Sequence, residues 1–259
     1  MFMATIQCGS VMQADALVTR DPSAMPIEPH HFWQEILPPA PSRAPGMHGY
    51  SDAFPAVLPD GSRLMLPIRV LPGAGDRAVA SLIVNQASFA VEDALAAAMT
   101  ALARPFEADV LVGVPTLGLP LAANVARRLG HGRMVPLGTS RKFWYRDDLS
   151  EPLRSITTPD QAKRIFLDPR MLPLIIGQRV LVIDDVLSSG ASMASVLRLL
   201  ARAGVVPVGI VAAMLQTERW VAATDAVSPG VSGRVRGAIR SPLLARGPDD
   251  LWHPADDQT

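Results

Sequence analysis

The segment VLVIDDVLSSGAS, residues 180–192, indicates both an architecture and a binding site. Four apolar residues precede two adjacent carboxylates, Asp184 and Asp185. The small residues that follow are Ser188, Ser189, Gly190, Ala191 and Ser192. Adjacent carboxylates repel each other, and burying either costs free energy unless something satisfies it. The segment therefore predicts a buried strand that ends at a ligand site.

The residues after this segment predict a helix that packs on the strand. Four apolar residues lie at helical spacing: Met193, Val196, Leu197 and Leu200. In open α/β sheets, ligands bind at the carboxyl ends of the strands, and small residues before a helix let backbone N–H groups surround an anion. Carboxylates beside an anion cradle would suit a sugar phosphate. A helix cap with a surface neighbour is the purely structural alternative for the two aspartates, and it leaves the run of small residues unexplained.

Alternating patterns extend this unit into a fold class. Strands are expected at 80–85, 109–115, 133–138, 163–169, 179–185 and 205–215, and helices at 88–103, 117–130 and 192–204. Nearly continuous apolar strands that alternate with helices are typical of a parallel sheet covered on both faces. We expect an α/β protein with a mostly parallel, doubly wound sheet.

The pattern of residues 180–192 resembles the phosphoribosyl-pyrophosphate (PRPP) motif of type I phosphoribosyltransferases. That resemblance implies that Asp184 and Asp185 contact the ribose hydroxyls, and that residues 188–192 wrap the 5'-phosphate. Many members carry glycine and threonine where this chain has Ala191 and Ser192. Both replacements keep the backbone N–H, and Ser192 keeps a hydroxyl.

Two further segments match the family in its order. The turn Pro115-Thr116-Leu117-Gly118 resembles the pyrophosphate loop. Arg141 and Lys142 resemble a basic pair that many members carry beside the pyrophosphate and base sites, where the pair would support the leaving group. An ordinary solvated charge pair is the alternative, but Lys142 is one of only two lysines.

A polar stretch from Phe143 to Ala162 interrupts the alternation and is long for a structureless connection, so we expect an active-site lid. It begins with Phe143, Trp144 and Tyr145, in a chain with few aromatic residues. These rings could stack on a planar base, or they could anchor the lid or a dimer interface.

Several other classes are excluded. Lys+Arg and Asp+Glu balance at 24 each, so no global field attracts nucleic acid or an anionic membrane. Cys8 is alone, which excludes a disulfide framework and fits a cytoplasmic protein. The first residues lack the basic start and apolar centre of a secretory signal.

No P-loop motif accompanies the aspartates. The dinucleotide-like GAGDRA at 73–78 leaves no room for its helix, so it is interpreted as a loop, and His30-His31 has no further metal ligands.

The predicted domains are an N-terminal extension and hood segment, 1–79, and a phosphoribosyltransferase core with a C-terminal tail, 80–259. Residues 53–72 predict two short strands around a Pro59-Asp60-Gly61 turn, and Pro67 suggests a sheet edge. The hood could come from residues 30–75, the segment 215–223 or residues 233–244.

The resemblance implies transfer of ribose 5-phosphate from PRPP to a nitrogenous base, with release of pyrophosphate. Magnesium would be held mainly by the substrate, with Asp184 or Asp185 assisting through water. Ser188 occupies a position where hypoxanthine-guanine members have aspartate, and the motif order is similar to the adenine/xanthine branch, so a purine acceptor is expected. The family also implies a homodimer. A non-catalytic PRPP sensor of the same fold is the alternative; it would often carry a DNA-binding domain or a basic face, and neither pattern is present.

Overall fold

The computed structural model describes residues 27–39, 49–153 and 163–255. Its central sheet has five strands in the order β10-β9-β8-β4-β5, and every neighbouring pair is parallel. The strands are β4 (Val110–Gly113), β5 (Val135–Pro136), β8 (Val180–Leu187), β9 (Gly209–Gln216) and β10 (Val235–Ser241). The central β8 is therefore flanked by β9 and β4, as its apolar composition predicts.

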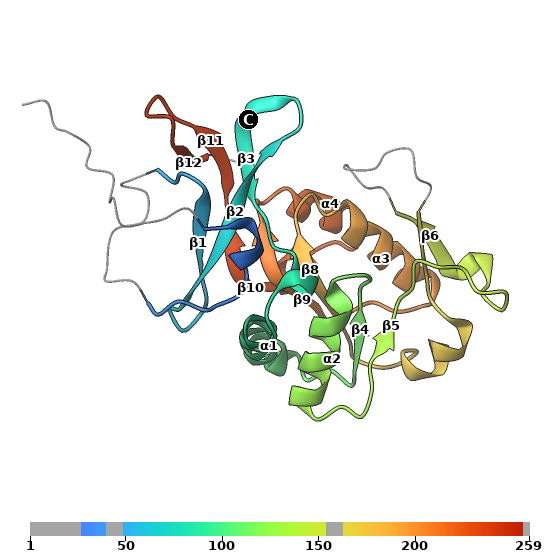
Figure 1. The fold of residues 1–259 in the computed structure, drawn as a ribbon. Coiled ribbons are helices and arrows are strands. Elements are labelled where there is room, and N and C mark those ends of the chain that lie inside the picture. The colour runs from blue at the N-terminus through green and yellow to red at the C-terminus, as the bar shows by residue number, and fades with distance from the viewer. Residues whose placement is uncertain (1–26, 40–48, 154–162, 256–259) are drawn as a thin grey trace, which may run out of the picture.

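Four helices pack with this sheet: α1 (Phe89–Ala103), α2 (Gly118–Leu129), α3 (Ala191–Arg202) and α4 (Trp220–Asp225). Apolar residues of α1 and α2 share one buried cluster with β8, and those of α3 share a second cluster with the same strand. Short 3-10 turns are η1 (Pro29–His31), η2 (Val84–Gln86), η3 (Arg104–Phe106), η4 (Asp147–Leu149), η5 (Pro169–Leu174) and η6 (Ser232–Arg234). The expected α/β class with a parallel sheet is confirmed, as Figure 1 shows.

A second sheet is antiparallel and combines both ends of the chain, on one side of the central sheet in Figure 1. Its strands are β1 (Ala53–Val57), β2 (Arg63–Leu71), β3 (Ala74–Ala80), β11 (Leu243–Arg246) and β12 (Trp252–Ala255). Their order is β1-β2-β3-β11-β12. At its junction with the central sheet, Gln216 Nε2 donates to the carbonyl of Ala80 at 2.6 Å. Strands from both sides of the expected boundary at residue 80 thus share one sheet, and the division into two domains stays a prediction, as do the hood and the doubly wound arrangement.

The second sheet corrects three expectations. Pro67 does not mark an edge, because β2 pairs with β1 on one side and β3 on the other. The GAGDRA segment is not a loop; it forms the turn and most of β3. The strand expected at 80–85 is absent, since β3 ends at Ala80 and Val84–Gln86 form η2.

A two-stranded antiparallel hairpin contains β6 (Ser150–Pro152) and β7 (Arg164–Phe166). The strand expected at 163–169 therefore exists, but it pairs with β6 and lies outside the central sheet. Residues 154–162 of the expected lid lie outside the described residues. The segment 233–244, considered for the hood, supplies β10 of the central sheet and the start of β11 in the second sheet.

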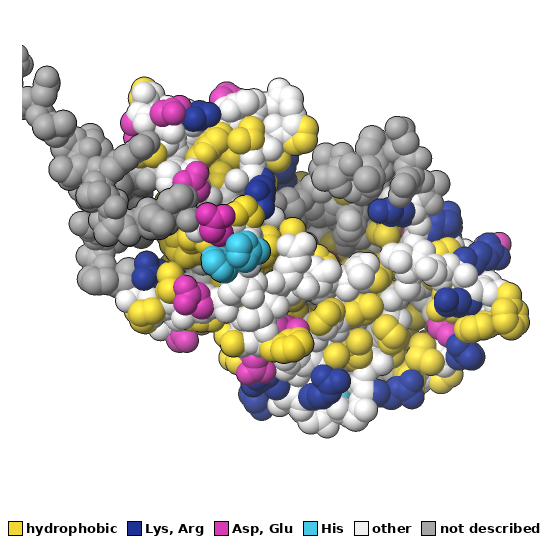
Figure 2. Space-filling view, viewed as in Figure 1, with side chains coloured by type: hydrophobic (Ala, Val, Ile, Leu, Met, Phe, Trp, Pro, Cys, Tyr) yellow, Lys and Arg dark blue, Asp and Glu magenta, His cyan; other side chains and the backbone are white. Residues whose placement is uncertain are grey.

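Both signs of charge appear on the face in Figure 2. Acidic side chains lie mostly at the left of this view, and Lys and Arg side chains lie mostly toward its right and lower edges. Each helix in the part of the chain that the structure describes is too short or too polar to cross a bilayer.

Candidate active site

The two aspartates lie where one neighbour of β8 stops. Strand β8 pairs with β4 only as far as Ile183, opposite Gly113, but it pairs with β9 as far as Leu187. Asp184 and Asp185 are therefore inside β8, beside a position where β4 has already turned away. Because β8 continues past both aspartates, the sheet holds their backbone more firmly than the expected end of a strand would.

No cation among the described residues accompanies the two carboxyl groups, and Asp184 is the more buried of the two. Asp184 is 6% exposed and Asp185 is partly exposed. The backbone N–H of Asp185 donates to Asp184 Oδ1 at 2.9 Å. Burial raises the pKa of Asp184 well above its ordinary value, and the neighbouring charge of Asp185 raises it further. Burial also raises the pKa of Asp185. A strongly shifted carboxyl pair at the edge of a parallel sheet is a candidate functional site.

The loop after the aspartates ends at the N-terminus of α3. Gly190 has a φ of 78°, and a Cβ there would lie 2.8 Å from Cα of Trp220 and 2.9 Å from Cβ of Ala223. The glycine thus permits both the left-handed turn and the close approach of α4. Ser188, Ser189 and Gly190 form the turn between β8 and α3, and Ala191 and Ser192 are the first two residues of the helix.

The N-terminus of α3 has little internal capping. Helix α1 is capped by Ser88, whose Oγ accepts from the N–H of Val91 at 3.2 Å. Helix α3 begins after Gly190, which has no side chain, and Ser189 Oγ accepts only a long 3.4 Å hydrogen bond from Ala191. The first-turn N–H groups and the helix dipole therefore favour an anion at this end.

The turn Pro115–Gly118 lies against the aspartates. The N–H of Val114 donates to the carbonyl of Ile183 at 3.0 Å, and α2 begins at Gly118. A Cβ on Gly118 would lie 3.0 Å from both Cα and Oδ1 of Asp184. The Pro115–Thr116 peptide bond is cis, and Thr116 is exposed. Two sequence-predicted loops, 115–118 and 188–192, thus adjoin one aspartate pair.

The basic pair is not joined to this centre by a described contact. Arg141 Nη1 pairs with Asp147 Oδ1 at 2.5 Å within its own segment, and Lys142 is exposed. The part of both residues in pyrophosphate binding stays a prediction.

The three aromatic residues beside the basic pair have two kinds of surroundings. Trp144 Nε1 donates to Asp168 Oδ2 at 3.2 Å, and the Arg170 guanidinium lies 4.6 Å from the centre of the Trp144 ring. Tyr145 lies near Phe166, with ring centres 5.8 Å apart. Phe143 is 95% exposed. Trp144 and Tyr145 thus fix this segment to β7 and η5, in agreement with the anchoring interpretation, whereas Phe143 has no such role.

Two buried carboxylates escaped the sequence interpretation. Asp168 precedes η5, and its bonds to Arg170 hold the pKa of that carboxyl at about 2. The local signal was an aspartate followed by Pro169, which is typical of a helix start. Glu151 on β6 is 4% exposed and pairs with two arginines of α3, and no local pattern indicated it.

Comparison with known proteins places the chain in a family. The family model described as phosphoribosyl transferase domain matches residues 84–229, which include both loops and the aspartate pair. The chain belongs to the phosphoribosyltransferase family. An adenine phosphoribosyltransferase of Frankia casuarinae is 30% identical over 186 residues, covering 72% of this chain and 92% of the relative. An orotate phosphoribosyltransferase of Chromohalobacter salexigens is 31% identical over 115 residues, covering 44% of this chain and 42% of the relative.

Solved structures of the family show the same fold. The adenine phosphoribosyltransferase of Giardia lamblia, complexed with 9-deazaadenine, aligns with a TM-score of 0.50 at 21% identity, covering 68% of this chain and 93% of that one. The Trypanosoma brucei enzyme, in complex with AMP, pyrophosphate and ribose-5-phosphate, aligns at 0.51 and 14% identity, covering 72% of this chain and 75% of that one. The expected family is confirmed, and this phosphoribosyltransferase is similar to members that act on adenine.

Proposed function

We propose that this phosphoribosyltransferase transfers the ribose 5-phosphate group of PRPP to a purine, with adenine as the first candidate. One observation supports the proposal most strongly. Asp184, which is buried with no cationic partner among the described residues, lies against the loop 115–118, and its strand leads into the loop 188–192. The similarity to the adenine phosphoribosyltransferase of Frankia casuarinae supports adenine as the acceptor.

Each part of the site has a role in substrate binding. Asp184 and Asp185 accept hydrogen bonds from the vicinal ribose hydroxyls, and such bonds to charged groups contribute about 1.5–3 kcal/mol each. The N–H groups and hydroxyls of residues 188–192 bind the 5'-phosphate, assisted by the dipole of α3. Backbone N–H groups of residues 115–118 bind the pyrophosphate, and Arg141 and Lys142 support it as it leaves.

These contacts serve the chemical step. The bond between C1' and the pyrophosphate oxygen breaks, and a bond between C1' and a purine nitrogen forms, while the proton of that nitrogen passes to solvent. The transition state has oxocarbenium character at C1', so fixed carboxylates nearby stabilise its developing positive charge.

The donor set also fits magnesium. The described residues hold no group of three or more acidic, histidine or cysteine ligands. Mg²⁺ commonly uses only one or two carboxylates together with substrate phosphates and water, so Asp185, and Asp184 through water, would suffice. When bound, the ion would neutralise charge on the leaving pyrophosphate. We further propose a homodimer in the cytoplasm, following the family resemblance.

The test is pyrophosphate release from PRPP and magnesium with a panel of bases: adenine, hypoxanthine, guanine, xanthine, orotate and uracil. Products are identified by mass spectrometry, and Asp185→Asn is the control. Turnover with a purine supports the proposal, and turnover with orotate alone would refute the purine acceptor. Calorimetric PRPP binding without turnover of any base would identify a sensor, and no binding by folded protein would end the proposal.

A further inference from the structure

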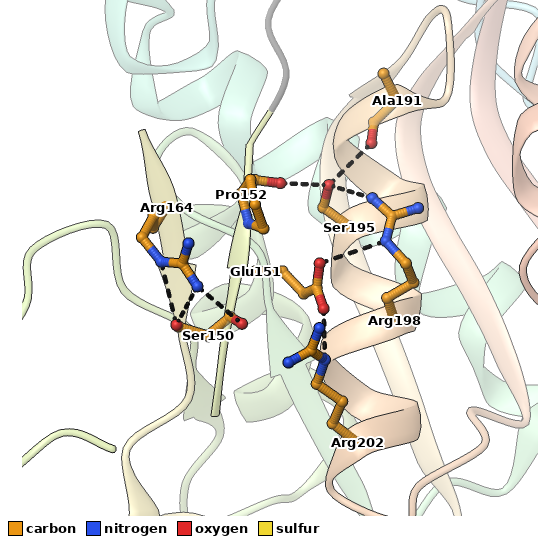
Figure 3. Close-up of polar contacts among 8 residues, drawn as sticks. All are labelled: Ser150, Glu151, Pro152, Arg164, Ala191, Ser195, Arg198 and Arg202. Carbon is orange, nitrogen blue, oxygen red and sulfur yellow. Dashed lines mark hydrogen bonds and ion pairs between the residues drawn. The ribbon is translucent and has the colours of Figure 1, made fainter. Parts of the chain in front are cut away.

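An ion-pair cluster around a buried carboxylate connects the β6–β7 hairpin with helix α3. Glu151 of β6 has a side chain only 5% exposed. Arg198 Nε donates to Glu151 Oε2 at 3.4 Å, and Arg202 Nε lies 2.6 Å from Oε1. The second contact is an ion pair without a well-directed hydrogen bond, since Oε1 accepts none. Figure 3 shows both arginines reaching from α3 to this carboxylate.

Ser195 extends the cluster to the first turn of α3. Its side chain is fully buried, and its Oγ lies 2.8 Å from the carbonyl oxygen of Pro152 and 3.3 Å from that of Ala191. Arg198 Nη2 donates to the same hydroxyl at 2.9 Å. The hydroxyl therefore links the end of β6 with Ala191, which belongs to the proposed phosphate loop (Figure 3).

On its other side, the hairpin is tied to the segment that carries the basic pair. Arg164 of β7 donates to Ser150 Oγ at 2.6 Å. Ser150 Oγ in turn donates to the carbonyl of Asp147 at 2.8 Å, and the Asp147 carboxylate pairs with Arg141. Polar contacts, together with the backbone of residues 147 and 150–152, thus connect Arg141 to Ala191.

We propose that Glu151, Ser195 and Arg198 are positioning residues that hold the Arg141–Lys142 segment and the 188–192 loop in a fixed relative arrangement. This inference rests on the proposed function, because its catalytic value lies in placing leaving-group support relative to the bound phosphate. A buried carboxylate with two arginines specifies one arrangement of β6 on α3 more strictly than apolar packing would. Fixing the Arg141–Lys142 segment relative to the 188–192 loop lowers the activation barrier without adding a contact to the substrate.

The kinetic test uses Glu151→Gln, which keeps the side-chain volume and removes the charge. Asp93→Asn is the matched control, since Asp93 pairs with Arg128 between α1 and α2. We expect Glu151→Gln to lower kcat about tenfold with the KM for PRPP nearly unchanged, and the control to lower neither. In a Lys142→Ala background, Glu151→Gln should add little further loss, because both changes remove the same support.

A second readout needs no substrate. Hydrogen exchange followed by mass spectrometry should show faster exchange in both 141–150 and 188–194 for Glu151→Gln, and in neither for the control. If Glu151→Gln folds poorly, Arg198→Gln, whose side chain is 44% exposed, replaces it. Three results would overturn the inference. One is an unchanged kcat with a lower melting temperature, and another is a loss of kcat that multiplies with that of Lys142→Ala in the double variant. The third is a change in exchange that is confined to the hairpin. An inactive wild type with coupled exchange would instead refute the proposed function alone.

Discussion

Asp184 and Asp168 are similarly shielded from solvent but have opposite surroundings. They are 6% and 8% exposed. Asp168 accepts from Arg170 Nε at 3.0 Å and Nη2 at 2.5 Å, and from Trp144 Nε1 at 3.2 Å. Within the described part of the chain, Asp184 accepts only from the N–H of Asp185 and has no cationic partner. The pKa is lowered at Asp168 and raised at Asp184.

This difference distinguishes a carboxylate that is buried for structural reasons from one that is buried for function. A carboxylate that carries its own partners stabilises the fold, and Glu151 belongs to the same group because of Arg198 and Arg202. A carboxylate that is buried without partners lowers the stability of the fold. Such a residue is retained where a ligand supplies the missing contacts. The same isosteric change, aspartate to asparagine, should therefore have opposite consequences at the two positions.

The largest expected effect is on turnover at the unpaired site. Asp184→Asn and Asp185→Asn should each lower kcat/KM about 10²–10³-fold, because each removes a fixed charge beside the reacting carbon. The melting temperature should not fall. Initial rates of pyrophosphate release and melting curves followed by circular dichroism measure both quantities. Loss of folding, with wild-type specific activity in the soluble fraction, would show that the pair is structural after all.

Gly190→Ala should have the next largest effect, an increase in the PRPP dissociation constant of about tenfold to 100-fold. The added Cβ would meet the backbone of Trp220 at 2.8 Å, so the loop must shift. Gly204→Ala is a matched control, because its φ of 73° is also left-handed but nothing lies within 4 Å of the added atom. Calorimetry on both variants separates steric displacement from backbone strain. Equal affinities would contradict a phosphate role for this turn.

At the paired site, the effect should be on stability. Asp168→Asn removes the charge opposite Arg170 and should lower the free energy of unfolding at pH 7 by about 1–3 kcal/mol, with kcat per folded molecule unchanged. The pKa of Asp168 falls from 3.8 to about 2 on folding, so its contribution is complete above the ordinary value and is lost as pH falls toward 2. Urea unfolding at pH 7 and pH 3 should show a smaller difference from wild type at the lower pH. An equal difference from wild type at both pH values would assign the loss of stability to packing.

Local signals explain which of these regions the sequence could predict. The β8–α3 unit was predicted nearly residue by residue, because its apolar run, acids, small residues and helical stripe are contiguous. Strand β3 was not, because the polar residues of GDRA carry no strand pattern. Its place is set by pairing with β2 and with β11 from the far end of the chain.

The same limit applies to the site. The two loops could be located because each follows a buried strand, and the aspartates because they follow the apolar run of β8. Glu151 could not be recognised, because its partners Arg198 and Arg202 come from a helix distant in sequence, and a charge on a short polar strand is ordinarily solvated. Buried pairing is a tertiary property, and only the structure distinguishes Glu151 from the exposed acids nearby.

The smallest expected effect is the pH dependence of stability at Asp184. Its pKa is raised on folding, so the folded protein binds more protons than the unfolded chain above the ordinary aspartate value, and wild-type stability falls as pH rises through that range. Asp184→Asn removes this penalty. Its melting temperature relative to wild type should therefore rise by a few degrees between pH 4.5 and pH 8, opposite in direction to the cost of Asp168→Asn. Because the two carboxyls titrate as a pair, Asp185→Asn should show the same trend. A constant offset across this range would mean that Asp184 is stabilised as an anion by the protein itself, and the distinction between the two buried aspartates would fail.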